Sequence, residues 1–227
     1  MNQTERSERS RAHILDAALA LFSHRGYRAT SIREIAERAG VSTGNVYHHF
    51  RDKDTIFKAL LDQYWTAIEN PDLPYNRALA AGEFPDNLET IGEAARDMIV
   101  QYRHHVALIY VDVVEFEGRH IQKFYADMSD RFERFAALQP NRQALQARLR
   151  DGVSLGVGLM LATRFFMNYF AVEVLFGVPN PFGKDTREMV AVIADVLRHG
   201  LAAPPSGRGD RAPAGSQGAG SIRDQSA

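Results

Sequence analysis

The sequence contains no cysteine among its 227 residues. This absence excludes disulfide frameworks, thiolate metal ligands and cysteine nucleophiles, and a reducing cytoplasm is the simplest location to expect. The sequence also lacks an excess of charge of either sign, with 27 Lys and Arg against 28 Asp and Glu. A globally basic nucleic-acid coat is therefore excluded, and any contact with nucleic acid must come from a local face of the molecule.

Long uninterrupted hydrophobic runs are also scarce. The first eleven residues, MNQTERSERSR, are polar and lack the apolar core of a signal peptide. One stretch, 152–177, is apolar enough to suggest a membrane span, but Arg164, Asn168 and Glu173 interrupt it. Each charge would cost about 2.5 to 3.5 kcal/mol at a bilayer centre. We therefore expect a buried or interfacial helix and no membrane partner.

Strand signals are missing from the second half of the chain as well. Between about 84 and 202 there is no alternating apolar run bounded by hairpin turns, whereas apolar residues recur at helical spacing. The sequence therefore predicts an all-α fold. Helices are expected over the following segments: 84–105, 106–118, 119–138, 142–150, 154–177 and 185–201.

The first 70 residues contain the best-marked helix boundaries. Apolar residues between Ile14 and Phe22 line one face of a first helix, which Gly26 can end. A second short helix follows, because Ser31 and Glu34 have the spacing of a capping box. Three further signals complete the unit: Ser42 can cap a third helix to about Phe50, Asp52 can cap a fourth, and Pro71 with Pro74 can close it.

Two short helices joined at Gly40 form a helix-turn-helix, in which the second helix enters the DNA major groove. That helix contains adjacent histidines, His48 and His49, which could suggest a metal site instead. They lie about 100° apart around the helix, and the carboxylate that follows them, Asp52, is expected to cap the next helix. The sequence favours a DNA-binding surface and no metal.

The pattern from Gly26 to Lys53, G-Y-x-x-T-S-I-x-x-I-A-x-x-A-G-V-S-x-G-x-x-Y-x-x-F-x-x-K, closely resembles the DNA-binding domain of the TetR family of transcriptional regulators. The resemblance covers about residues 9–68. It implies a helix-turn-helix domain followed by a helical domain that binds a small molecule and forms a homodimer.

Carried over by position, the resemblance implies a specific set of DNA contacts. Thr43, Gly44 and His48 are expected near base edges, and Tyr47, His49 and Lys53 at phosphates. Many relatives carry lysine where this chain has Thr43, which leaves the base preference open. Arg33 is similar to a base-reading position in some members, or it pairs with Glu37 on the same helix. The complete expected set is Thr30, Ser31, Arg33, Ser42, Thr43, Gly44, Asn45, Tyr47, His48, His49 and Lys53.

Polar residues set among apolar ones indicate a candidate effector pocket in the second domain. The candidates are Tyr102, His105, Tyr110, Asp112, Glu115, His120, Tyr125, Met128, Arg164, Asn168 and Tyr169. Four of them, His105, Asp112, Glu115 and His120, could also be assembled into a metal set, although their spacing follows no known ligand pattern. No metal or other cofactor is expected.

The last two helices are expected to form the dimer interface, as the resemblance implies. Aromatic residues on the first and aliphatic residues on the second offer the contact area. The same residues could equally be buried in the core of the second domain. The expected interface residues are Phe165, Phe166, Tyr169, Phe170, Met189, Val192, Ile193 and Val196.

The chain is thus expected to have four parts: a flexible arm (1–8), the helix-turn-helix domain (9–70), the ligand-binding and dimerisation domain (71–202) and a Gly/Pro/Ser-rich disordered tail (203–227). The predicted function is that of a regulator, a repressor that binds an inverted-repeat operator and is released by a small-molecule effector. The alternatives are an activator or architectural protein without effector, or an enzyme acting on the pocket ligand, for which no catalytic motif is found.

Overall fold

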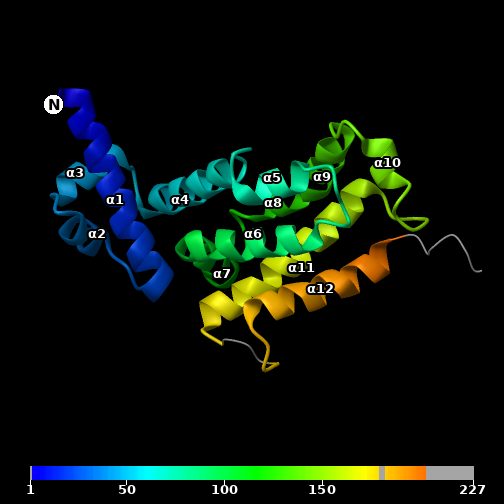
Figure 1. Cartoon of the computed structure of the whole chain (residues 1–227). Coiled ribbons are helices and arrows are strands. Elements are labelled where there is room, and N and C mark those ends of the chain that lie inside the picture. Colours follow the sequence, from blue (N-terminus) through cyan, green and yellow to red (C-terminus); the bar gives the residue numbers. More distant parts are fainter. Residues whose placement is uncertain (1, 179–181, 203–227) are drawn as a thin grey trace, which may run out of the picture.

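The computed structural model describes residues 2–178 and 182–202, and over these ranges the chain forms twelve α-helices and no strand (Figure 1). The helices are α1 (Gln3–Arg25), α2 (Ile32–Ala39), α3 (Thr43–His49), α4 (Lys53–Ile68), α5 (Pro74–Ala80), α6 (Leu88–Gln101), α7 (Arg103–Phe116), α8 (Gln122–Ala126), α9 (Met128–Ala137), α10 (Arg142–Gln146), α11 (Leu155–Phe176) and α12 (Thr186–Leu201). The all-α prediction is confirmed. The expected tail, 203–227, lies outside the described residues.

Helices α1 to α3 and the first half of α4 form a small unit that we call the head. Its core contains Phe22 from α1, Ile35 from α2 and Val46 from α3, all of them inaccessible to solvent. Leu108 of α7 and Ile121 of the following turn belong to the same core. The head therefore packs directly on the rest of the chain through shared apolar contacts.

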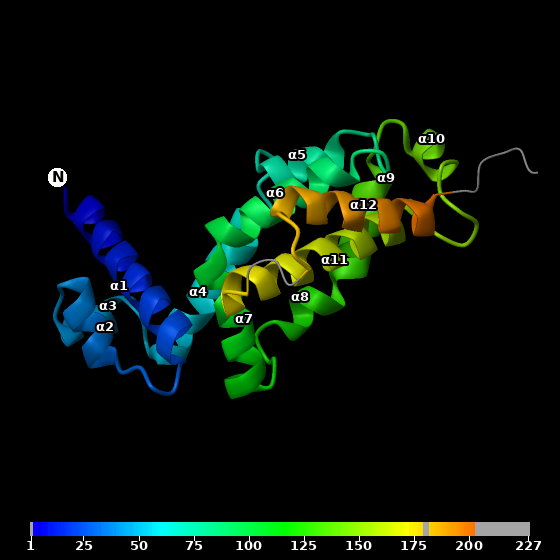
Figure 2. The same cartoon turned by 60° about the horizontal axis from the view of Figure 1, so that its bottom comes forward.

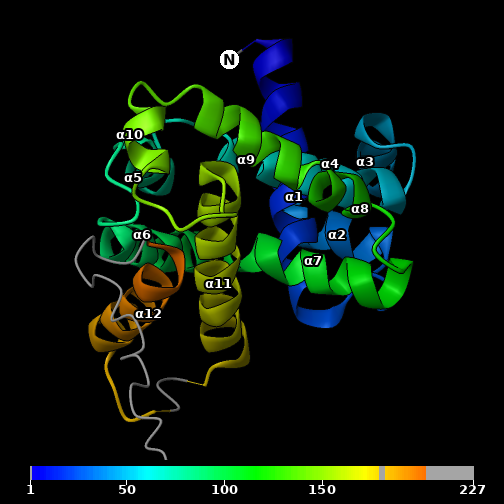
Figure 3. The ribbon, with the colours of Figure 1, turned by 90° about the vertical axis from the view of Figure 1, so that its right-hand side faces the viewer.

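The second unit, which we call the body, is built around α11. This helix packs against α6 and α9, and α12 packs against α6 (Figure 3). Phe166 and Phe170 of α11 are fully buried, with ring centroids 6.4 Å apart and nearly parallel planes. A Cβ at Gly92 of α6 would lie 2.6 Å from the Phe166 ring, so glycine permits the close approach of α6 and α11.

Helix α11 is the apolar segment that the sequence singled out. It has 22 residues and is apolar enough to cross a membrane by length and composition alone. Leu159, Phe166 and Phe170 are nevertheless buried against other helices of the same chain. These contacts place one side of α11 in the core of the body.

The structure corrects several expected boundaries. Residues 3–8 belong to α1 instead of forming a separate arm, because Asn2 and Glu5 make a capping box at its start. Pro74 does not simply close the first unit but begins α5, where a proline at the first position leaves no helical hydrogen bond unmade. The segment expected to be one helix over 119–138 contains two, α8 and α9, which are separated at Asp127.

Figure 2 shows the head projecting from one end of the body and joined to it through α4. Contacts between α1 and α7 and between α4 and α7 reinforce this connection. The packing brings the end of α7 close to the loop between α1 and α2. Changes in the body can therefore reach the head through α4 and α7.

Candidate nucleic-acid interface

The turn between α2 and α3 is defined by three local signals. The Ser31 side chain accepts a hydrogen bond from the backbone N–H of Glu34, and the Glu34 carboxylate accepts one from the Ser31 N–H, which completes the predicted capping box. Gly40 ends α2 in the left-handed conformation, with φ 69° and ψ 32°. Ser42 then caps α3 by accepting a hydrogen bond from the Asn45 N–H over 3.1 Å.

Helix α3 divides into a buried side and an exposed side. Val46 and the following Phe50 are buried in the head core. Thr43, Gly44, Tyr47 and His48 are exposed, with Tyr47 at 57%. The helix contains no acidic residue. Its outward side therefore offers hydroxyl and imidazole groups, an aromatic ring and a close approach at Gly44 without repelling a phosphate backbone.

Two of the expected DNA residues on α3 are only half exposed. Asn45 accepts a hydrogen bond from the Ser10 hydroxyl of α1 over 2.5 Å, which ties α3 to α1. His49 packs its ring near those of His48 and Phe50. Burial lowers the pKa of the His49 imidazole, and the charges of His48 and Arg11 lower it further. A neutral His49 can donate one hydrogen bond, but it adds no positive charge to the surface.

Thr30 does not fit its expected place on the DNA-binding surface. Its side chain is buried, and its hydroxyl donates to the Gly26 carbonyl over 2.9 Å, so it shapes the loop before α2.

Arg33 forms the ion pair with Glu37 that was the alternative in the sequence analysis, with 2.9 Å between Nε and Oε1. Both of these side chains are exposed, so the pair is weak and leaves Arg33 free to exchange partners.

Lys53 has a role in the structure that the sequence did not suggest. Its ammonium donates to the carbonyl oxygens of Tyr27 and Thr30, each over 2.7 Å. It also lies 4.1 Å from the centroid of the Tyr27 ring. Burial lowers the pKa of the Lys53 ammonium, although Glu115 and Glu34 oppose this effect. Lys53 therefore fixes the loop between α1 and α2, whether or not it also meets a phosphate.

Arg51 is a candidate DNA contact that the sequence analysis missed. It follows α3 directly, its side chain is 87% exposed, and it pairs with Asp52. Asp52 caps α4 by accepting hydrogen bonds from the hydroxyl and the N–H of Thr55. These bonds and the Arg51 contact lower the pKa of Asp52 to about 2. The sequence did contain a signal for this contact, because Arg51 is a basic residue at the end of the helix-turn-helix.

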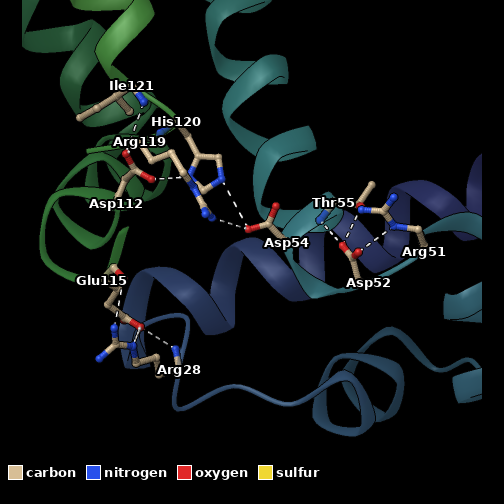
Figure 4. Close-up of polar contacts among 10 residues, drawn as sticks. All are labelled: Arg28, Arg51, Asp52, Asp54, Thr55, Asp112, Glu115, Arg119, His120 and Ile121. Atoms are coloured by element: carbon tan, nitrogen blue, oxygen red, sulfur yellow. Dashed lines mark hydrogen bonds and ion pairs between the residues drawn. The ribbon is translucent and has the colours of Figure 1, made fainter. Parts of the chain in front are cut away.

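The head and the body are joined by a polar network at the end of α7 (Figure 4). Asp112 is fully buried, and its carboxylate accepts hydrogen bonds from the backbone N–H groups of His120 and Ile121. The Nδ1 of His120 lies 2.5 Å from the same carboxylate, and its Nε2 lies 3.5 Å from Asp54 of α4. Arg119 also donates to Asp54, over 3.1 Å.

Glu115 makes a second connection between the two units. Its carboxylate accepts hydrogen bonds from the backbone N–H groups of Tyr27 and Arg28, over 2.8 and 2.7 Å. Glycine is favoured at position 26 beside it, because φ there is 86° and a Cβ would lie 2.5 Å from the Glu115 Oε1. We call Asp54, Asp112, Glu115, Arg119 and His120 the head–body junction.

The junction accounts for three of the expected effector-pocket residues and corrects that prediction. Asp112, Glu115 and His120 bond to protein groups and join the two units instead of lining an open pocket. Within the described residues, no group of three or more histidines and carboxylates forms a metal site. The metal set considered for these residues and His105 is therefore not assembled.

The other expected pocket residues fall into two places. Tyr102 and His105 line a groove of about 630 Å³ between the head and the body. The remaining six lie at or near the surface of α7, α8, α9 and α11: Tyr110, Tyr125, Met128, Arg164, Asn168 and Tyr169. Among these, burial raises the pKa of Tyr125, with a further increase from Tyr110 and an opposing effect of Arg164. These three side chains therefore lie within electrostatic reach of one another.

The expected dimer residues separate into buried and exposed sets. Phe166, Phe170, Met189 and Ile193 are buried in the core of the body, so their side chains are unable to meet a partner. Phe165, Val192 and Val196 are exposed, at 47%, 40% and 61%. Tyr169 is half-buried. Leu161 and Val172 of α11 are exposed at helical spacing from Phe165 and extend the same apolar face.

Comparison with known proteins agrees with this geometry. Residues 14–60 match the family described as "Bacterial regulatory proteins, tetR family". The chain is 41% identical over 71 residues to the HTH-type transcriptional regulator AcrR of Shigella flexneri, a match that covers 31% of this chain and 33% of AcrR. It is 29% identical over 199 residues to the HTH-type transcriptional repressor KstR2 of Rhodococcus jostii, a match that covers 86% of this chain and 92% of KstR2.

The fold as a whole also has a solved counterpart. The crystal structure of NalD, the secondary repressor of the MexAB-OprM multidrug efflux pump in Pseudomonas aeruginosa, superimposes with a TM-score of 0.60 at 22% identity. The superposition covers 87% of this chain and 98% of NalD. The helix-turn-helix domain is therefore similar in sequence to that of the tetR family of bacterial regulatory proteins over residues 14–60, and the chain as a whole shares the fold of NalD.

Proposed function

We propose that the protein is a transcriptional repressor that binds an inverted-repeat operator as a homodimer and is released by a small-molecule effector. The observation that carries this proposal is the outward side of α3, where Thr43, Gly44 and His48 are exposed beside a helix N-terminus capped by Ser42. Repression, as opposed to activation, is supported by the name of the KstR2 relative. A regulator of this kind acts on chromosomal DNA, so we place it in the cytoplasm.

The DNA contacts divide into two groups in this proposal. Thr43, Gly44 and His48 approach base edges, whereas Tyr47, His49 and the exposed Arg51 meet phosphates. Ser31 lies exposed at the start of α2, where free backbone N–H groups favour an anion. The charge of the head is small, with nine Arg and Lys against seven Asp and Glu over residues 1–55, a net charge of +2. Non-specific binding should therefore be modest, and affinity must come from two heads acting together.

The dimer face in this proposal consists of the exposed residues of α11 and α12. Leu161, Phe165 and Val172 form a stripe on α11, and Val192 and Val196 form a second stripe on α12. A two-fold axis between two such faces places the heads symmetrically, which requires an inverted repeat in the operator. The effector acts through the head–body junction, because that network links α7 to α4 and to the loop before α2.

The test is selection of DNA by the full chain from a pool of random duplexes. We expect enrichment of an inverted repeat whose half-sites lie about one helical turn apart, or a multiple of it. Enrichment of an asymmetric single site would contradict the dimer, and no enrichment over the starting pool would contradict specific DNA binding. Transcription from a promoter that carries the selected site then decides between repression and activation. If the protein instead converted a candidate effector to a product in the absence of DNA, the result would support the alternative that the protein is an enzyme.

A further inference from the structure

A groove of about 630 Å³ lies where the head meets the body. One wall comes from α1, with Asp16 and Leu19, and another from α4, with Leu60 and Tyr64. The body closes it with Tyr102 and His105 at the junction of α6 and α7. Its volume is within the range of small-molecule sites, about 300 to 1,000 Å³.

The floor of the groove is aromatic. The rings of Tyr64 and His105 are stacked, with centroids 5.7 Å apart and planes at 17°. The Tyr102 ring lies 5.6 Å from that of Tyr64 and 6.0 Å from that of His105. Burial lowers the pKa of His105 and His104 lowers it further, while Asp16 opposes both effects, so the neutral imidazole with a lone pair for a donor is favoured. The floor thus offers π faces and hydrogen-bond acceptors.

The Tyr64 hydroxyl is an unpaired polar group of the groove. The Tyr64 side chain is only 5% exposed, and its hydroxyl makes no hydrogen bond to any of the described residues. The hydroxyl is not among the fully buried polar atoms that lack a partner, so it is accessible from the groove. A ligand in the groove could supply the missing bond.

The charged residues that line the groove are mostly acidic. Asp16 of α1 and Asp62 of α4 both line the groove, and neither carboxylate forms an ion pair within the described ranges. Arg11, the cation of the rim, lies 5.2 Å from the centroid of the Phe50 ring. The groove therefore carries a net charge of −1 beside an aromatic floor and the apolar walls of Leu19, Ala59 and Leu60.

We propose that this groove is a binding site for an organic amine with an aromatic or aliphatic body. The ammonium is held between Asp16 and Asp62 and over the aromatic floor, because carboxylates and π faces both attract cations. Its N–H groups donate to the hydroxyl of Tyr64 and to the neutral imidazole of His105. The apolar body packs along Leu19 and Leu60. This site is separate from the α3 surface and does not depend on the proposed repression.

The test is isothermal titration calorimetry on the full chain at pH 7.5 with three matched probes. They are 2-phenylethylamine, which is cationic, 2-phenylethanol, which is neutral, and 3-phenylpropionate, which is anionic. We expect the amine to bind at least tenfold more tightly than the alcohol, and the anion to bind most weakly. An amine that binds no more tightly than the alcohol would overturn the proposal.

Variants then locate the site. The double variant Asp16→Asn/Asp62→Asn should lose roughly tenfold in amine affinity, as expected for two carboxylates near the surface, while its affinity for the alcohol stays the same. Asp130→Asn, on the exposed surface of α9, is the matched control and should bind the amine like the parent. Equal losses in the double variant and the control, or no loss in either, would place the amine elsewhere and overturn the assignment. Melting curves verify that all three proteins are folded.

Discussion

The carboxylate of Glu115, in the last turn of α7, accepts a hydrogen bond from the backbone N–H of Tyr27 over 2.8 Å, across the boundary between body and head. The Glu115 side chain is only 15% exposed, and it also accepts the Arg28 N–H. From the other side, Lys53 holds the carbonyl oxygens of the same loop. The loop that leads into the helix-turn-helix is thus held by one anion of the body and one cation of the head.

Replacing Glu115 with alanine should loosen this loop. The change removes two hydrogen bonds to a charged acceptor and leaves two backbone donors without it, which should cost about 2 to 3 kcal/mol. We expect a lower free energy of unfolding in urea and weaker operator binding. Glu93→Ala, on the exposed side of α6, is the matched control and should change neither quantity. A Glu115 variant as stable as the parent would show that the junction contributes nothing.

Lys53→Met separates the two roles considered for this residue. If the ammonium serves mainly to hold the loop, the variant should lose stability and operator affinity while the dependence of affinity on salt stays the same. If it neutralises a phosphate, the slope of log affinity against log salt should fall by about one unit. Because two donors of the ammonium already meet protein carbonyls, we expect the first result. Affinities measured at several salt concentrations decide between them.

The stability of the protein should decrease in mild acid, in part through His105. Burial lowers the pKa of this imidazole in the folded state, so the unfolded chain takes up the proton first as the pH falls. The contribution of neutral His105 is therefore complete above about pH 6.5 and is lost as the pH decreases below it. We expect the melting temperature to fall between pH 7.5 and 5.5, and to fall less in His105→Gln. An unchanged slope in that variant would refute this origin.

Much of the head could be predicted from the sequence, because its signals are local. Ser31 with Glu34, Gly40 and Ser42 each act within a few residues, and the structure confirms all three boundaries. The role of Lys53 could not be predicted, because its partners lie 23 and 26 residues earlier in the chain. The sequence also cannot show which of two neighbouring aromatic residues faces the core, as with Phe165 and Phe166.

The same limit explains the effector-pocket prediction. A polar residue among apolar ones can line a pocket or bond to a distant part of the chain, and the local pattern is the same in both cases. Asp112 and Glu115 do the latter, through contacts that no spacing rule reveals. Tyr102 and His105 do line a groove, but the partners that form it, Asp16 and Asp62, come from helices assigned to the other domain.

Charges on the exposed face of α12 should separate the dimer. Val192→Asp/Val196→Asp places two carboxylates where an apolar face is proposed, and neither position supports the monomer core. We expect monomers in light scattering, and a loss of operator affinity of about 10² to 10⁴ because the two heads no longer act together. Val114→Asp/Leu138→Asp, at sites 80% and 82% exposed, is the matched control and should remain a dimer. A dimer that survives the first pair of charges would place the interface elsewhere.

The most direct test of the account is the operator affinity of Gly44→Leu, measured by fluorescence anisotropy on the selected duplex. A Cβ at Gly44 would meet only the Ser42 hydroxyl, at 3.8 Å, so the fold and the melting temperature should be preserved. Ala80→Leu is the matched control, because Ala80 is exposed at the end of α5 and lies outside both α3 and the proposed dimer face. We predict that Gly44→Leu loses at least a hundredfold in affinity while Ala80→Leu binds like the parent. Parental binding by a folded Gly44→Leu would contradict the placement of α3 in the major groove.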